Sequence, residues 1–295
     1  MGADVQIKKI KNALLFVDTN ILLDFYRADG GSMGAEFLSL MEQHKDILIT
    51  GSQVAMEFKK NRQGVISAFL KNFRVPDLSP IKPPPFLKNT PQHKALLINQ
   101  KAFNASCEKI KKRISSVISN PSVNDPVYIA LQKIFRHSSP YNLDRSKDVR
   151  HEIRELAKKR FLLGYPPRKE GDTSIGDAIN WEWIIYCASR EKRNVIIVTR
   201  DHDYGYQLNL NDWLKQEFKE RVSSKKNVFI TNSLSAAFKM ISVAVKQSTE
   251  NNEKAFIDSL SLTVNATNAS PLNIYEPGLP GILQALSDSG KLQLN

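Results

Sequence analysis

The sequence has only two cysteines, Cys107 and Cys187, among its 295 residues. This excludes both a disulfide framework and a cysteine-based zinc site. It also lacks any apolar run close to the ~20 residues that a membrane-spanning helix needs. The apolar run behind the N-terminal lysines, residues 13–17, is too short for a signal peptide. We therefore expect a cytoplasmic protein with no membrane segment.

Acidic residues are scarce in the middle of the chain. Between residues 58 and 169 there are 24 Lys and Arg against 7 Asp and Glu, a balance of +17. Because the whole chain carries +12, the remainder carries −5. One lysine-rich helix face usually indicates a solvated surface, but three basic segments in succession, with aromatic residues among them, favour a surface that binds a polyanion. The candidates for this surface are Lys59, Lys60, Arg62, Lys111, Lys112, Arg113, Lys158, Lys159 and Arg160.

Short apolar runs alternate with amphipathic stretches on both sides of this basic region. The runs are typical of strands buried on both faces, as in a parallel sheet, and lie at 13–17, 47–50, 195–199 and 228–231. Helical spacing of apolar residues predicts helices at 21–27, 35–44, from 52 onward, 174–190, 212–222 and 234–245. The sequence therefore predicts an α/β domain with a mainly parallel central sheet, interrupted by a basic, mainly helical insertion.

Proline and glycine mark the ends of the insertion. Prolines at 76, 80 and 83–85 break regular structure, and Gly-Tyr-Pro-Pro at 164–167 ends the insertion. Between them we expect helices at 92–119, 127–137 and 146–163. We divide the chain into a first domain part at 1–71, the insertion at 72–169, a second domain part at 170–246 and a tail at 247–295. The tail is rich in Ser, Asn and Pro, and its docking candidates, on the body or on a partner, are Ile274, Tyr275, Leu279, Ile282 and Leu283.

Two acids follow predicted strands. Asp18 comes directly after the first strand, and Asp201 comes two residues after Thr199, at the end of a later one. In open α/β sheets, ligand sites form outside the carboxyl ends of the strands. Two acids there repel each other unless a cation or a shared proton neutralises them. Hard cations such as Mg²⁺ prefer oxygen ligands, so a metal site suits this pattern.

Two further acids lie early in predicted helices. Asp177 follows Gly176, although Ser174-x-x-Asp177 also resembles a capping box, which is the simpler interpretation of Asp177 alone. Glu57 lies beside the apolar positions of its helix, and a surface glutamate is the alternative. No one of the acids is specific. Their joint placement, each just past a strand end or early in the next helix, favours a common site.

The order of these segments resembles that of the PIN-domain nucleases, in particular the longer bacterial PIN-like proteins with a helical insertion. The resemblance rests on Phe-Val-Asp-Thr-Asn at 16–20, Glu57, Ile-Gly-Asp-Ala at 175–178 and Val-Thr-Arg-Asp-His-Asp at 198–203, and covers about 12–70 and 170–245. It implies a three-layer PIN-like fold. It also implies that four catalytic acids bind one or two Mg²⁺ or Mn²⁺ ions: Asp18, Glu57, Asp177 and Asp201. Asn20 and Thr199 match positions that orient the ligands.

Several neighbouring residues stay ambiguous. Asp203 could share or replace the role of Asp201 as a metal ligand, whereas Asp172 fits a turn residue better than an outer ligand. His202 could contact the scissile phosphate, but a solvent-facing loop histidine is the simpler interpretation. Trp181 and Trp183 face different ways on one helix, so we expect Trp181 in the core and Trp183 at an interface or lid.

The resemblance implies a nuclease that hydrolyses phosphodiester bonds. RNA is the first expected substrate, as for an endoribonuclease, and structure-specific DNA cleavage is the second. Asn20 stands where a phosphatase of the haloacid-dehalogenase type needs a second acid, so we discount that class. The rival from another class is a non-catalytic PIN-like module that binds nucleic acid or protein. A toxin or an anti-phage defence effector is the expected role, with a homo-oligomer or a restraining protein partner as further expectations.

Overall fold

The structure is a computed structural model of the chain. It describes residues 8–28, 31–73, 75–78, 83–168, 174–206 and 208–268. The chain forms two compact units, Met1–Lys254 and Ala255–Asn295. Of the second unit, the structure describes residues 255–268, which form the C-terminal part of helix α11 (Gln247–Asn268). The sheet and the candidate site lie in the first unit.

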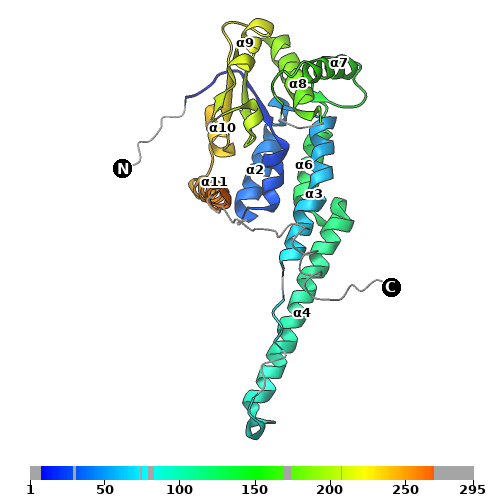
Figure 1. Cartoon of the computed structure of the whole chain (residues 1–295), viewed down its shortest axis with the longest axis vertical. Helices are drawn as coiled ribbons and strands as arrows, with labels where there is room; N and C mark the ends of the chain where they lie inside the picture. The colour runs from blue at the N-terminus through cyan, green and yellow to red at the C-terminus, as the bar shows by residue number, and fades with distance from the viewer. Residues whose placement is uncertain are drawn as a thin grey trace, which may run out of the picture. The chain divides into compact units, whose positions relative to one another are not determined.

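A five-stranded parallel sheet forms the centre of the first unit (Figure 1). Its strands are, in spatial order, β3 (Asn142–Leu143), β2 (Leu48–Gly51), β1 (Ala13–Val17), β4 (Asn194–Val198) and β7 (Val228–Thr231). β1 and β4 pair along their whole length, with Val17 opposite Val198. Residues that follow these two strands therefore begin at the same edge of the sheet.

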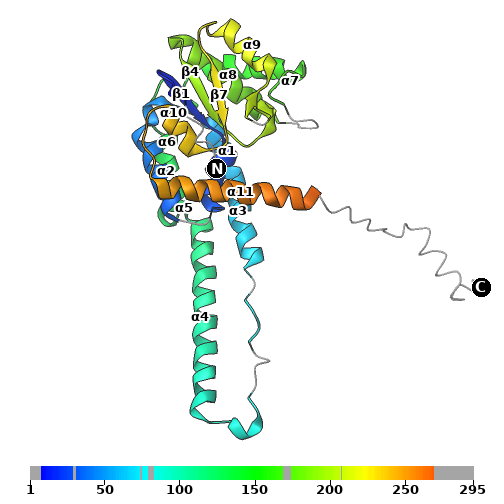
Figure 2. The same ribbon diagram turned by 90° about the vertical axis from the view of Figure 1, so that its left-hand side faces the viewer.

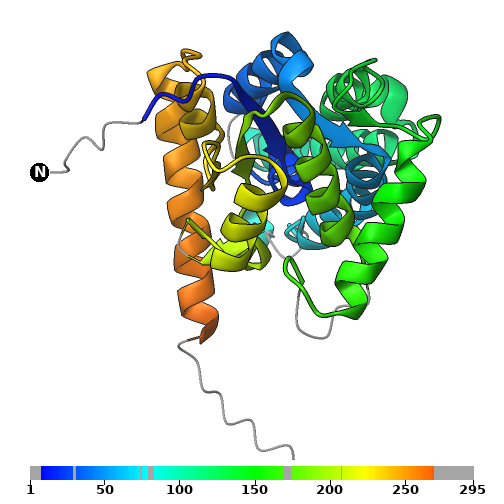
Figure 3. The ribbon, with the colours of Figure 1, turned by 90° about the horizontal axis from the view of Figure 1, so that it is seen from above.

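The sheet is the middle one of three layers (Figure 3). Every residue of β1 is buried, as the continuous apolar run predicts for a strand covered on both faces. Helices α2 (Gly31–Gln43), α6 (Pro126–Phe135) and α10 (Leu234–Met240) lie on one side, and α7 (Val149–Leu162), α8 (Gly176–Glu191) and α9 (Asp212–Arg221) on the other. The predicted α/β architecture with a parallel sheet is confirmed.

The basic insertion contributes directly to these layers. Strand β3 pairs with β2, with Thr50 opposite Asn142, while α6 packs against α2 and α7 against α8. The two-residue strand β3 carries no apolar run that could have predicted it. Within the described residues, helix α4 (Pro91–Ser119) extends beyond the three layers, beside the segment that precedes it (Figure 2).

The remaining elements are short, apart from helix α3 (Ser52–Asn72). They are α1 (Thr19–Leu23), η1 (Asp24–Tyr26), η2 (Lys45–Ile47), η3 (Pro85–Leu87), α5 (Pro121–Asn124), η4 (His202–Tyr204), β5 (Gly205–Tyr206) and β6 (Asn209–Leu210). Helix α10 is shorter than the predicted 234–245, because it ends at Met240 and Ser242 takes a positive φ of 67°. The antiparallel pair of β5 and β6 was not predicted.

The beginning of the predicted tail is helical and attached to the first unit. Glu253 accepts hydrogen bonds from the backbone amides of Leu234 (2.6 Å) and Ser235 (2.9 Å), at the start of α10. Because the first amides of a helix lack partners within it, this carboxylate stabilises the α10 N-terminus. The docking residues expected between 274 and 283 lie outside the described residues. In the part of the chain that is described, no helix is long and apolar enough to cross a membrane.

Candidate metal centre

Asp18 is held at the carboxyl end of β1. It is 4 % exposed, and its backbone amide donates to the carbonyl of Val198 at 2.9 Å. Its Oδ1 accepts from the amide of Thr19 at 2.6 Å, and its Oδ2 accepts from Thr199 Oγ1 at 2.6 Å. These bonds fix the carboxylate at the sheet edge where β1 and β4 both end.

Asn20 and Thr199 join the ends of the two strands. Asn20 Nδ2 donates to Asp18 Oδ2 at 2.9 Å and to Thr199 Oγ1 at 3.2 Å. The amide of Asp201 also donates to Thr199 Oγ1, at 3.0 Å. Arg200, between them in sequence, forms an ion pair with Asp24. The structure therefore brings Asn20 and Thr199 to Asp18 as expected, and their role in orienting metal ligands stays a prediction.

Glu57 lies close to Thr19, the residue after Asp18, and to Gly176, the residue before Asp177. Thr19 Oγ1 donates to its Oε2 at 3.1 Å, and Gln53 Nε2 donates to its Oε1 at 2.6 Å. Gly176 passes so close that a Cβ at this position would overlap Glu57 Oε1. Because Gly176 directly precedes Asp177, this close approach brings the start of α8 against the second turn of α3.

Tyr204, a buried residue that the sequence analysis did not single out, lies near all four acids. Tyr204 is fully buried, with its ring 6.5 Å from that of Phe16 and 6.4 Å from that of Trp181. Burial raises the pKa of its phenol well above the usual value, and four carboxylates raise it further: Asp177, Asp18, Glu57 and Asp201. All four predicted acids therefore lie near the same buried side chain. Nothing in the local sequence marks Tyr204, three positions after Asp201, as a residue of this site.

The electrostatics of Asp18 indicate a site that is short of positive charge. Burial raises the pKa of Asp18 to about 7, against the lowering effect of the hydrogen bond from Thr199. The carboxylates of Asp201 and Glu57 add to the increase. A buried acid surrounded by like charge is stabilised when a cation compensates the charge.

The donor set suits a hard divalent cation in its chemistry. Carboxylate oxygens are the ligands that Mg²⁺ and Mn²⁺ favour, and Glu57, Asp177 and Asp201 are each partly exposed at the sheet edge. Within the described ranges, no three Asp, Glu, His or Cys side chains stand close enough to share one ion.

The residues around the cluster have different environments. Asp203 lies in η4, two residues after Asp201, so the choice of ligand between these two acids stays open. His202 is exposed, as expected for a loop histidine. Trp181 is buried as predicted, but the prediction for Trp183 is wrong, because it is 3 % exposed and its Nε1 donates to the carbonyl of Thr50 at 2.9 Å. Asp172 lies outside the described residues.

Two of the nine basic candidates for nucleic-acid binding are wrong. Arg62 is 2 % exposed, and its Nε donates to Asp125 at 2.7 Å. Arg160 is 4 % exposed, with its Nε donating to Glu182 at 2.8 Å. Each therefore neutralises a buried acid of its own fold. Most of the others are exposed, with Lys111 partly so: Lys59, Lys60, Lys111, Lys112, Arg113, Lys158 and Lys159.

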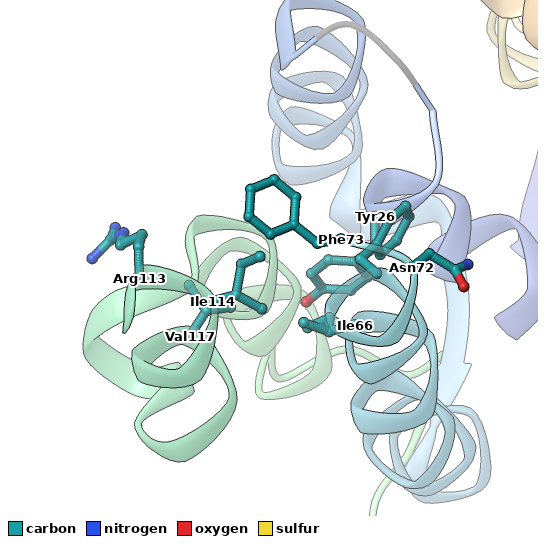
Figure 4. A pocket seen from close by; sticks show the side chains of 8 residues that line it. Tyr26, Ile66, Asn72, Phe73, Arg113, Ile114 and Val117 are labelled. Atoms are coloured by element: carbon teal, nitrogen blue, oxygen red, sulfur yellow. The ribbon is translucent and has the colours of Figure 1, made fainter. Parts of the chain in front are cut away.

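An apolar hollow of about 490 Å³ lies apart from the acids, between the ends of α3 and α4. In Figure 4 the side chains of Ile66, Phe73 and Ile114 line it, with the guanidinium of Arg113 to one side. No carboxylate is among the described residues that line it. This hollow is therefore not part of the candidate metal centre.

A comparison with protein families agrees with this geometry. The family model of the PIN domain matches residues 15–204, from β1 to Tyr204, and this span includes all four acids. The chain belongs to the PIN-domain family. The match also runs through the insertion, consistent with β3, α6 and α7 being parts of the layered PIN domain. Neither the curated proteins nor the solved structures contain a match. The PIN domain is a nuclease-type fold.

Proposed function

We propose that this PIN domain is a metal-dependent nuclease that hydrolyses phosphodiester bonds, with RNA as its substrate. The observation that carries the proposal is the gathering of four acids around Tyr204 at the carboxyl edge of the sheet. In this proposal Asp18, Glu57, Asp177 and Asp201 hold one or two Mg²⁺ or Mn²⁺ ions. Asp203 is the alternative to Asp201.

When bound, divalent ions would act as Lewis acids that lower the pKa of bound water. Their positive charge would stabilise the phosphate during hydrolysis. The chain's own residues hold the ligands in place. Thr199 and Asn20 orient Asp18, and Thr19 and Gln53 orient Glu57. Such hydrogen bonds to metal ligands fix their direction and tune their basicity. The carboxylates act as ligands in this mechanism and not as nucleophiles.

The substrate class follows from charge. Lys59 and Lys60 are exposed on α3, the helix that carries Glu57, and Lys158 and Lys159 are exposed on α7. Lysines on a surface beside the site bind phosphates without reading sequence. The preference for RNA over structured DNA rests on the resemblance to PIN nucleases, as does a role as a toxin or anti-phage defence effector that a protein partner or self-association restrains.

The test is cleavage of labelled structured RNA and single-stranded DNA by the full chain in Mg²⁺, Mn²⁺ or EDTA. We expect RNA cleavage that EDTA abolishes and that Asp18→Asn lowers by about 100-fold or more. Asp212→Asn is the matched control, because Asp212 is an exposed acid in the first turn of α9. Cleavage that is unaffected by both EDTA and Asp18→Asn contradicts the proposal. Binding without cleavage in either metal supports the rival interpretation of a non-catalytic module.

A further inference from the structure

A second, smaller hollow, whose lining is more apolar than polar, adjoins the acid cluster at the carboxyl ends of β2 and β3. Thr50 and Asn180 line it, together with Gln53 from the first turn of α3 and Arg150 and Arg154 from α7. No described residue of its lining is acidic. We call this the β2–α3 hollow. It is separate from the apolar hollow beside α4, with which it shares no lining residue.

Two buried side chains in the β2–α3 hollow have polar atoms without partners. Asn180 is 4 % exposed, and its Nδ2 meets no hydrogen-bond acceptor among the described residues. Thr50 is 8 % exposed, and its Oγ1 has no hydrogen-bond partner within the described residues. A buried polar group left unpaired costs about 1–3 kcal/mol. A ligand that supplies acceptor oxygens removes this cost.

The N-terminus of α3 opens into the same hollow. No side chain caps this 21-residue helix, because its N-cap residue is Gly51. A Cβ at Gly51 would lie only 3.0 Å from Leu143 Cβ, so the pairing of β2 with β3 leaves no room for a capping side chain. The first amides of a helix lack acceptors within it, and its positive dipole end favours an anion.

Two arginines complete the set of donors. Arg150 and Arg154 are four residues apart on α7 and therefore share one face of the helix. Arg154 is exposed and Arg150 partly buried, and neither forms an ion pair within the described residues. Guanidinium groups bind phosphate oxygens in pairs of hydrogen bonds. Paired arginines, a helix N-terminus and a buried amide donor are the chemistry of an oxyanion site.

We propose that the β2–α3 hollow binds a phosphate group of the nucleic-acid strand, beside the phosphate that is hydrolysed. The cavity, about 10 Å³, has room for about one water-sized atom. One phosphate oxygen enters toward Asn180 and Thr50, and the others lie at the rim against the arginines and the α3 amides. The binding of phosphate stands by itself, whereas its position next to the cleaved bond rests on the proposed nuclease function.

The hollow lies about one helical turn from the acid cluster. Gln53 lines the hollow and donates to Glu57 at 2.6 Å, one turn further along α3. Asn180 lies three residues after Asp177 on α8. One turn of helix spans ~5 Å, which places the bound group next to the metal centre. A single phosphate bound there, terminal or internal, therefore lies beside the acids.

The first test measures binding of inorganic phosphate to the full, EDTA-treated chain by calorimetry. We expect saturable binding that is weakened about tenfold or more in the double variant Arg150→Ala/Arg154→Ala. The control is Lys8→Ala/Lys9→Ala, which removes the same charge from exposed residues before the amino end of β1, at the opposite edge of the sheet, and leaves the affinity unchanged. Equal weakening in both double variants, or no binding by wild type, overturns the proposal. Asp18→Asn retains phosphate binding, so this result does not depend on nuclease activity.

The second test distinguishes the source of the phosphate. RNA strands with 5′-phosphate, 3′-phosphate or hydroxyl ends, and a circular RNA, are cleaved by wild type and by Arg150→Ala/Arg154→Ala. A preference for one phosphorylated end that the double variant loses identifies a terminal phosphate. An equal rise in KM for all substrates, the circle included, identifies an internal one. Unchanged KM values in a variant that no longer binds phosphate overturn the placement beside the cleaved bond.

Discussion

Thr199 Oγ1 donates a 2.6 Å hydrogen bond to Oδ2 of Asp18, and this bond joins two residues that lie 181 positions apart in the chain. It is possible because β1 and β4 pair side by side and end together. The bond has two effects on Asp18. It orients the carboxylate, and it partly counteracts the rise in pKa that burial imposes.

Removal of this hydroxyl therefore weakens the site in a pH-dependent way. In Thr199→Val the pKa of Asp18 rises further, so less of the carboxylate is ionised at neutral pH. We expect RNA cleavage to fall about 10- to 100-fold at pH 7, and the pH profile of kcat/KM to move to higher pH. Thr199→Ser keeps the hydroxyl and is the control. A parallel loss at every pH would contradict the role assigned to the hydrogen bond.

Asp18 makes the metal-free protein sensitive to pH. Its pKa is about 7 in the fold and 3.8 as the reference value for an unperturbed group. As pH rises from 4 to 7 the unfolded chain releases this proton first, so the folded state loses stability over this window and stays less stable above it. In EDTA, the Tm of Asp18→Asn relative to wild type is expected to rise from pH 4 to pH 8. A difference in Tm that does not vary with pH, as expected for Asp212→Asn, would contradict this assignment.

Metal binding is expected to restore the stability that the folded state loses when Asp18 is ionised. An ion that binds only the folded state stabilises it by about 2.7 kcal/mol at a concentration of 100 times Kd. For a domain of this size that corresponds to a rise of about 5 to 10 °C in Tm. We expect Mg²⁺ or Mn²⁺ to raise the Tm of wild type at pH 8 and to have little effect on Asp18→Asn. Equal shifts in both proteins would place the ion elsewhere.

The exclusion of Arg62 from the nucleic-acid surface can be tested against its exposed neighbour. Arg62→Ala leaves the carboxylate of Asp125, 1 % exposed, without its buried partner. We expect a loss of about 3 to 5 kcal/mol in the free energy of unfolding, measured in urea. Lys59→Ala should leave stability nearly unchanged and weaken RNA binding, with a shallower dependence on salt. Weaker RNA binding by a stably folded Arg62→Ala would show that Arg62 does contribute to the nucleic-acid surface.

Gly176 offers a way to displace one acid without mutating it. A Cβ in Gly176→Ala would push against Glu57 Oε1, the end of a flexible side chain, so the fold can adjust. We expect a loss of metal affinity and of cleavage, about tenfold or more, with Tm nearly unchanged. Gly64→Ala is the control, because no atom lies within 4 Å of the added Cβ in the middle of α3. It should raise stability by about 0.5 to 1 kcal/mol.

The sequence predicted those parts of the site that follow from strand ends. Asp18 and Asp201 lie next to apolar runs that form adjacent parallel strands, so their convergence could be expected. Asp177 and Glu57 needed the order of the helices as well. Tyr204 could not be recognised, because an aromatic side chain in a loop gives no sign that it packs between Phe16 and Trp181.

The errors have a common physical origin. A basic residue in a lysine-rich helix predicts an exposed charge, yet Arg62 and Arg160 face buried acids from other parts of the chain. The partner of Arg62, Asp125, is 63 positions away, and no local pattern reveals it. Trp183 is similar, because its indole bonds to the carbonyl of Thr50, 133 positions away. Residues whose environment depends on such distant partners cannot be assigned from local patterns.

The pairing of β1 with β4 also sets when the metal centre can exist. Asp18 and Glu57 are synthesised early, whereas Asp177 and Asp201 follow the long insertion. A growing chain has three of the four acids once α8 has emerged, and it gains the fourth, Asp201, only after β4. β4 must then pair with β1, and closing so long a loop is among the slower steps of folding. On the proposed function, we therefore expect a nascent or truncated chain without β4 to be inactive, with activity appearing only when nearly the whole PIN domain is complete.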